Sequence, residues 1–164
     1  QSHIDLARAV WLDYCECKMI DTIAREPLWR HLINYRCGTG HSVSFVGNVH
    51  EGPHALNSRN TTRMRPGMVV TDEPGVYETD LVGIRIENEL VCIHKADNQY
   101  GTFLGFEPLT FVPIATSPIL PGVLDKDEIA WLNDYHRQVF AKLAPHLNAE
   151  ERVWLAEKCA SIGC

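Results

Sequence analysis

The chain has 164 residues, of which 45% are hydrophobic and 22% are charged. This composition argues against intrinsic disorder and predicts a folded chain with a sizeable buried core. The formal net charge is −6 and the basic residues are scattered, so the sequence offers no extended basic patch for nucleic acid. No apolar run approaches the roughly 20 residues that cross a bilayer, and we expect no membrane partner.

Six cysteines occur at uneven spacings, and the chain shows no secretory signal pattern. We therefore expect reduced thiols and a cytoplasmic location. Cys15 and Cys17 could hold a metal, but one such pair without a second is a weak signal, and thiols near a loop are the simpler interpretation.

The first third of the chain has a helical pattern that begins almost at Gln1. Apolar spacing predicts a helix to about Leu12 and a second helix around 19–25, with Pro27 after it or in its last turn. Because the pattern starts within a helix, we expect the chain to be part of a longer protein.

The middle of the chain predicts loops and then strands. Residues 36–67 are rich in Gly, His and Asn, which is typical of loops that serve a site. In the segment 83–89 apolar and polar residues alternate, so Arg85, Glu87 and Glu89 are expected to share one face of a strand. The predicted strands are 68–70, 81–87, 89–94, 102–106 and 109–113.

The last part of the chain predicts helices with clear start signals. Asp125 is followed three residues later by Glu128, and Asn148 by Glu151, the spacing of a capping box. We divide the chain into a main domain over 1–114 and a helical extension over 115–164.

Three places concentrate groups that could bind a metal: His41, Glu73 and Glu87. Each alone is more often a solvated surface group. Together, one imidazole and two carboxylates suit Mn²⁺ or Zn²⁺, and Arg85 could orient a ligand carboxylate. Residue types alone therefore leave a metal hydrolase as one of several interpretations.

Four short motifs follow one another in a distinctive order: GTGH at 38–41, NVHEGP at 48–53, TDEPG at 71–75 and GIRIEN at 83–88. They resemble aminopeptidase P (Xaa-Pro aminopeptidase), one of the pita-bread metallopeptidases. The stretch GTFLGFEPLT at 101–110 resembles the C-terminal extension of the longer members. The resemblance implies an α+β fold: part of a pita-bread domain, with a curved, mainly antiparallel sheet, flanking helices and a C-terminal helical extension.

The resemblance also implies roles for individual residues. By it, His41, Glu73 and Glu87 are metal ligands, Glu73 accepts a proton and Glu87 bridges two ions. His50 would contact the substrate and stabilise charge on the scissile carbonyl, and Arg85 would support the ligands. Four further histidines match no motif and are expected at the surface: His54, His94, His136 and His146.

The implied activity is metal-dependent hydrolysis of the N-terminal Xaa-Pro bond in a peptide with proline at its second position. The family uses a dinuclear centre, for which we expect Mn or Zn. Tyr77 is expected to line the substrate site. The bond to proline has no N–H, so a dedicated pocket for the ring is expected.

The sequence also departs from the family pattern. The family takes two further aspartate ligands from strands upstream of the first helix, and this sequence has no such motif. We therefore expect a truncated piece with partial or absent metal, inactive alone, that forms a homodimer or associates with the missing N-terminal portion. Ser42 and Ser44 stand where glycine is usual, and Cys37 where many relatives have histidine.

Two alternative functions remain open. The serines and the incomplete ligand set would also suit a non-catalytic pseudo-peptidase that binds peptides or proteins. A prolidase-like dipeptidase would share the same motifs.

Overall fold

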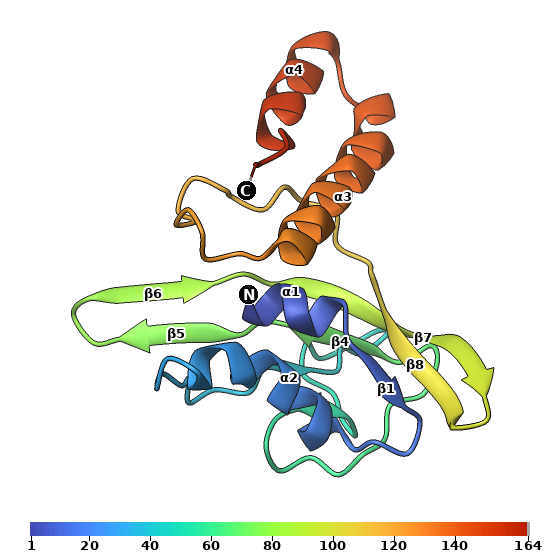
Figure 1. Cartoon of the computed structure of the whole chain (residues 1–164). Helices are drawn as coiled ribbons and strands as arrows, with labels where there is room; N and C mark the ends of the chain where they lie inside the picture. Colours follow the sequence, from blue (N-terminus) through green and yellow to red (C-terminus); the bar gives the residue numbers. More distant parts are fainter. Residues whose placement is uncertain (164) are drawn as a thin grey trace. The chain divides into compact units, whose positions relative to one another are not determined.

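In the computed structural model, which describes residues 1–163, the chain divides into two compact units. The first is Gln1–Thr110 and the second begins at Phe111 (Figure 1). The domain boundary at 114/115 stays a prediction. No helix within the described part of the chain combines the length and apolarity needed to cross a membrane.

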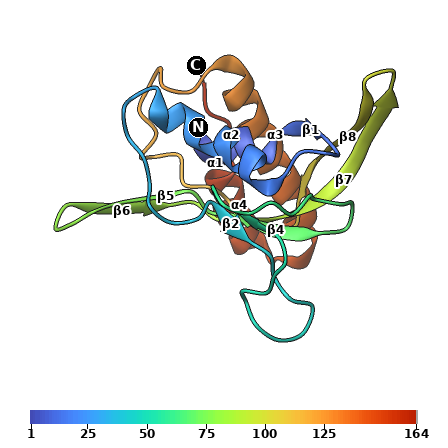
Figure 2. The ribbon, with the colours of Figure 1, turned by 90° about the horizontal axis from the view of Figure 1, so that it is seen from below.

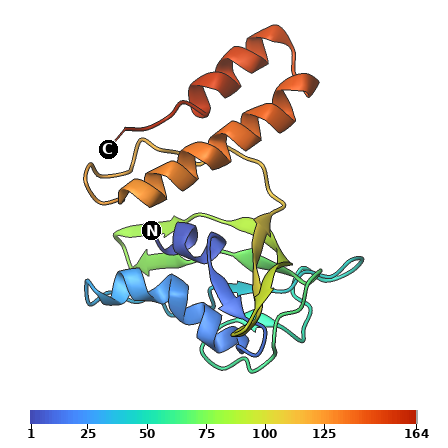
Figure 3. The same cartoon turned by 45° about the vertical axis from the view of Figure 1, so that its right-hand side comes forward.

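The first unit opens with α1 (Ser2–Ala7), β1 (Val10–Leu12) and α2 (Cys17–Trp29), and the two helices pack against each other (Figures 1 and 3). The prediction of one helix to about Leu12 is wrong beyond Ala7. Val10 and Trp11 are residue types that favour strands, and pairing with another strand outweighs the helical spacing.

The second predicted helix is confirmed and is longer than 19–25. Pro27 lies inside α2, close to its end at Trp29. A proline there removes only one of the last backbone hydrogen bonds, so the helix tolerates it in its last turn.

The main sheet is antiparallel, with strand order β1-β8-β7-β4. Its other strands are β4 (Val69–Asp72), β7 (Asn88–Asn98) and β8 (Gly101–Pro108). The register shifts between His94 and Ala96, within the β7–β8 hairpin. The strands bury a core that includes Trp11, Val70, Leu90, Cys92, Leu104 and Phe106.

Two small sheets adjoin the main one. β2 (Gly40–His41) pairs with β3 (Ala55–Leu56), and β5 (Gly75–Glu78) pairs with β6 (Val82–Arg85). The β5–β6 and β7–β8 hairpins extend in opposite directions (Figures 1 and 2).

The strand predictions at 68–70, 81–87, 89–94 and 102–106 correspond to β4, β6, β7 and β8, but the strand at 109–113 is wrong. Residues Leu109 and Thr110 still bond to Glu89, and the chain then leaves the sheet. The single strand predicted through Glu87 is also wrong. β6 ends at Arg85 and β7 begins at Asn88, so Glu87 lies between two strands.

The second unit is a helical hairpin of α3 (Lys126–Leu143) and α4 (Ala149–Lys158), joined by the short 3₁₀ helix η1 (Ala144–His146) (Figure 3). Both predicted capping boxes are confirmed. The Asp125 side chain accepts from Glu128 N at 2.8 Å, and the Glu128 side chain accepts from Asp125 N at 2.7 Å.

Two histidines expected at the surface are buried, so those predictions are wrong. His136 Nε2 accepts a hydrogen bond from Ile114 N at 3.1 Å, and His54 Nε2 contacts the Val69 carbonyl at 2.7 Å. Burial lowers the pKa of His136, which favours the neutral ring that this hydrogen bond requires. In each ring, Nε2 contacts a backbone group of another segment, while Nδ1 is buried without a hydrogen-bond partner.

The five cysteines within residues 1–163 are free thiols, and Cys164 lies outside the described residues. Burial raises the pKa of both Cys17 and Cys92 to about 11, so these two thiols stay protonated and unreactive at neutral pH.

The substitution Asp125→Ala should lower the free energy of unfolding of the helical unit by about 1 kcal/mol, because it removes the acceptor for Glu128 N. Urea denaturation followed by circular dichroism measures the change. Asp127→Ala, in the same first turn but not the capping residue, is the matched control. An equal decrease in the free energy of unfolding of the two variants would show that the capping hydrogen bond does not stabilise the helix.

Candidate metal centre

The structure brings together the three residues predicted to bind metal. His41, Glu73 and Glu87 each offer a ligand atom, and these atoms lie within 4.8 Å of one another. His41 Nε2 is 3.0 Å from Glu73 Oε1. His41 and Glu73 are partly buried, whereas Glu87 is exposed, so the cluster opens to solvent on one side.

The cluster forms because residues 39–42 run alongside β4. Glu73 N donates to the Thr39 carbonyl at 2.8 Å, and Ser42 forms a bridge with Val70. Gly40 makes this approach possible. A Cβ atom there would lie 1.8 Å from the Thr71 carbonyl oxygen, so only glycine fits without displacing β4.

Hydrogen bonds orient the His41 ring. Its Nδ1 lies 3.1 Å from the Ser42 carbonyl, which can only accept, so Nδ1 carries the proton. Nε2 then faces the carboxylate of Glu73. Two electron-donating atoms, the Nε2 lone pair and a carboxylate oxygen, thus lie 3.0 Å apart, an arrangement that suits a cation held by both.

Thr71 and Arg85 hold the carboxylates from two sides. Thr71 Oγ1 accepts from His41 N at 3.0 Å and donates to Glu73 Oε1 at 3.0 Å. Arg85 lies 3.4 Å from Glu73 Oε2 through Nη1 and 3.4 Å from Glu87 Oε2 through Nε. Arg85 therefore contacts both acidic residues of the cluster, and its supporting role stays a prediction.

His50 lies next to the cluster, although it is distant from Glu73 in sequence. Its ring centroid is 3.9 Å from that of His41, edge to face. A cavity of about 370 Å³ is lined by both histidines together with Glu73, Arg85 and Cys37. Tyr77 is not part of this cavity. Its ring lies over Gly75 and Gly83 of the β5–β6 hairpin, and a Cβ on Gly75 would lie 2.7 Å from the Tyr77 hydroxyl oxygen.

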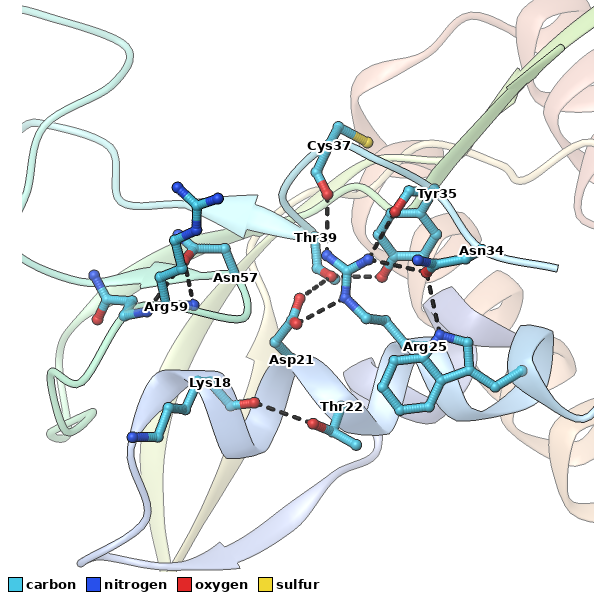
Figure 4. Close-up of polar contacts among 12 residues, drawn as sticks. Lys18, Asp21, Thr22, Arg25, Asn34, Tyr35, Cys37, Thr39, Asn57 and Arg59 are labelled. Atoms are coloured by element: carbon cyan, nitrogen blue, oxygen red, sulfur yellow. Dashed lines mark hydrogen bonds and ion pairs between the residues drawn. The ribbon is translucent and has the colours of Figure 1, made fainter. Parts of the chain in front are cut away.

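A buried ion pair supports the loop that leads to His41, and sequence reasoning missed it. Arg25 Nε donates to Asp21 Oδ2 at 2.7 Å, and the Thr39 hydroxyl donates to Asp21 Oδ1 (Figure 4). Arg25 also donates to the carbonyls of Tyr35 at 2.8 Å and Cys37 at 3.0 Å. The available signal was the spacing of Asp21 and Arg25, four residues apart in a predicted helix.

Asp72, next to Glu73, is fully buried and contacts His3. His3 Nδ1 lies 3.3 Å from Asp72 Oδ2 and 3.2 Å from the Asp72 carbonyl. Burial raises the pKa of Asp72 to about 6, and the attraction of His3 offsets part of this rise.

Comparison with known proteins identifies the family. The model of metallopeptidase family M24 matches residues 1–94, and that of the C-terminal region of peptidase M24 matches residues 102–162. The chain belongs to metallopeptidase family M24. This confirms the resemblance on which the expected site residues rest, while their individual roles stay predictions.

Similar M24 proteins are named as aminopeptidases that act at proline. Aminopeptidase P2 of Arabidopsis thaliana is 43% identical over 94% of this chain and 23% of its own length. The X-prolyl aminopeptidase of Caenorhabditis elegans, described as a cytosolic enzyme with a di-nuclear active site, has a TM-score of 0.91 and 39% identity over 98% of this chain.

The X-Pro aminopeptidase of Thermotoga maritima is more distant, with a TM-score of 0.54 and 29% identity over 68% of this chain. The likeness to the C. elegans enzyme confirms the pita-bread fold. The chain spans about a quarter of the length of these relatives: 23% of the Arabidopsis protein, 27% of the C. elegans chain and 28% of the Thermotoga chain.

The residues that depart from the family pattern lie in two different environments. Neither Ser42 nor Ser44 lines the 370 Å³ cavity, and Ser42 is buried beside β4. The serines therefore do not narrow that cavity. Cys37 does line it, and its thiol donates to the Gly75 carbonyl at 3.6 Å.

Replacing Gly40 with alanine should separate residues 39–42 from β4, because the new Cβ would overlap the Thr71 carbonyl. We expect a loss of about 1–3 kcal/mol in the free energy of unfolding, together with weaker binding of divalent metal. Gly38→Ala is the matched control, since a Cβ there meets ordinary contacts at 3.4 Å or more. Isothermal titration calorimetry and denaturation measure both effects, and similar behaviour of the two variants would contradict the role of Gly40.

The raised pKa of Asp72 predicts a pH dependence of stability. The folded state holds the Asp72 proton up to about pH 6, whereas an unfolded aspartate has an ordinary pKa of 3.8. Between these two pKa values the folded state binds more protons than the unfolded state. The free energy of unfolding should therefore fall by roughly 3 kcal/mol from pH 4 to 6 and then level off. Denaturation of wild type and Asp72→Asn in metal-free buffer measures this difference. Parallel pH curves for the two proteins would refute it.

Proposed function

We propose that this chain forms part of a metal-dependent aminopeptidase that hydrolyses the N-terminal Xaa-Pro bond of peptides. The observation that carries the proposal is the grouping of His41, Glu73 and Glu87, whose ligand atoms lie within 4.8 Å of one another. Membership of family M24 and relatives named as Xaa-Pro aminopeptidases support it.

The residues of the cluster fit a divalent ion of the Mn²⁺ or Zn²⁺ type. One imidazole nitrogen and two carboxylates are ligands that these ions accept. Glu73 and Glu87 bring two negative charges, and Arg85 compensates only part of them. When bound, divalent ions would supply Lewis acidity and an acidified water. A dinuclear centre needs more ligands than these three, so further ligands would have to join them.

The chain's own residues would carry out the proton and charge steps. Glu73 would accept the proton of the attacking water, and Thr71 and Arg85 would keep its carboxylate in place. His50 would donate a hydrogen bond to the oxygen of the scissile carbonyl as negative charge develops on it. Its position beside His41, in the same cavity, supports this assignment.

We further propose a cytoplasmic location, a peptide substrate with proline second, and an assembly with another chain or segment. The C. elegans relative is described as cytosolic, which supports the location. Exposed apolar side chains on the β5–β6 hairpin support the assembly, because such surface is usually covered: Tyr77, Leu81, Val82 and Ile84.

Metal content tests the proposal directly. The purified chain should bind Mn²⁺ or Zn²⁺, and Glu87→Gln should weaken binding at least tenfold by removing one charged ligand. Glu89→Gln removes the same charge two residues away, outside the cluster, and should change nothing. Titration calorimetry and elemental analysis give affinity and stoichiometry, and mass spectrometry of an Ala-Pro peptide detects any released alanine.

The outcomes separate the candidate functions. Metal bound by wild type and by Glu89→Gln, but lost in Glu87→Gln, would support a metallopeptidase site. Metal bound equally well by wild type and Glu87→Gln would overturn the proposed site, and no metal in any of the three proteins would fit the pseudo-peptidase or a piece that needs its further ligands. Cleavage of the dipeptide Ala-Pro but of no longer peptide would favour the prolidase-like alternative.

A further inference from the structure

A second and larger cavity, of about 690 Å³, lies on the other side of the loop that leads to His41. Three parts of the chain line it: Arg25 and Trp29 of α2, residues 34–38 after α2, and residues 57–59 after β3. Figure 4 shows the last two facing each other, with Asn34, Tyr35 and Cys37 on one side and Asn57 and Arg59 on the other. Cys37, Gly38 and Asn57 line both this cavity and the one beside the metal cluster, so the two cavities adjoin.

The polar side chains of this cavity offer mainly hydrogen-bond donors. Asn34 Oδ1 accepts from Arg25 Nη1 and Trp29 Nε1, both at 3.2 Å. Asn57 Oδ1 accepts from the backbone N–H of Arg59 at 3.0 Å and of Asn60 at 3.1 Å. All four partners can only donate, so each amide must present its oxygen to them and its NH₂ group is left for a ligand.

The charge of the cavity is positive in a chain whose net charge is −6. No aspartate or glutamate lines it, whereas Arg25, Arg36 and Arg59 do. Arg25 is compensated by Asp21. Arg36 and Arg59 are exposed and form no ion pair with any residue from 1 to 163.

Several contacts hold the backbone beside the cavity in place. Arg25 binds the carbonyls of Tyr35 and Cys37 and stacks over the Tyr35 ring, 4.2 Å from its centroid. These contacts hold the backbone that carries Arg36. A ligand would therefore have to order only the arginine side chains.

We propose that this cavity binds a carboxylate of the peptide substrate, on the part of the peptide that follows the proline. The inference rests on the proposed Xaa-Pro peptidase function. Guanidinium and amide groups without a competing acid match a carboxylate, and guanidinium pairs with it in a planar, two-bonded geometry. Because the cavity adjoins the metal cluster, a peptide held by its N-terminus at the cluster can extend into it. Arg36 and Arg59 then select acidic peptides.

Calorimetric binding of three tetrapeptides to the chain, with and without Mn²⁺, tests the proposal. Ala-Pro-Gly-Glu amide carries a side-chain carboxylate, Ala-Pro-Gly-Gln with a free C-terminus carries a terminal one, and Ala-Pro-Gly-Gln amide carries neither. We expect one or both carboxylate peptides to bind about tenfold more tightly than the neutral amide, and this preference to shrink in high salt.

The double variant Arg36→Gln/Arg59→Gln should abolish the preference while leaving the affinity for the neutral amide unchanged. Arg63→Gln/Arg65→Gln is the matched control. It removes the same charge from two arginines that line a different cavity, and it should keep the preference. The acidic peptide should also protect Cys37 from alkylation, detected by mass spectrometry, because Cys37 lines the proposed path.

The possible results separate this proposal from the proposed function. Equal binding of all three peptides, strengthened by Mn²⁺, would overturn the carboxylate site and leave the peptidase function intact. A preference that survives in Arg36→Gln/Arg59→Gln would also overturn it. Competition by inorganic phosphate without any preference for acidic peptides would assign the cavity to free anions instead. No binding of any peptide would count against both proposals.

Discussion

The candidate site depends on the close approach of residues 39–42 to strand β4. Glu73 N bonds to the Thr39 carbonyl, and His41 N bonds to the Thr71 hydroxyl. The side chains of His41 and Glu73, more than 30 residues apart in the sequence, therefore lie next to each other. Gly40 is the residue that permits it, because the Thr71 carbonyl occupies the space of any Cβ. The negative charge gathered here is compensated in part by Arg85, which spans both glutamates. A divalent ion would complete that compensation.

The loop before His41 lies between two cavities. Cys37 and Gly38 of this loop line both the cavity beside His41 and Glu73 and the larger cavity that Asn34 and Asn57 line. The ion pair between Asp21 and Arg25 holds this loop to helix α2. Burying an ion pair costs free energy, and removing one partner of a buried pair costs still more. Here Arg25 also donates to Asn34 and to two loop carbonyls, and Asp21 accepts from Thr39. The stability of α2 is thereby linked to the geometry of the site.

Local signals predicted some elements well and others poorly. The capping boxes at Asp125 and Asn148 were recognisable because they depend only on residues three apart. The strand β1 was not, because Val10–Leu12 becomes a strand only through pairing with β8. His136 looked like a surface residue on a helix, yet its ring is buried and accepts a hydrogen bond from Ile114 N. Glu87 was predicted on a strand face, and a break between β6 and β7 instead turns it toward His41.

The sequence by itself determined the metal-capable residue types, the order of the motifs and, through their resemblance, the family. These properties are carried by short segments whose meaning does not depend on distant partners. Only the tertiary structure decided that the side chains of His41, Glu73 and Glu87 meet. It also decided that Tyr77 lies outside the cavity lined by His41 and Glu73, and that Asp21 and Arg25 hold the loop before His41. The tertiary structure also revealed the 690 Å³ cavity, because Asn34 and Asn57, which line it, come from separate segments of the chain. The Asn57 oxygen is bonded within a local turn, whereas the Asn34 oxygen is bonded to Arg25 and Trp29 of helix α2.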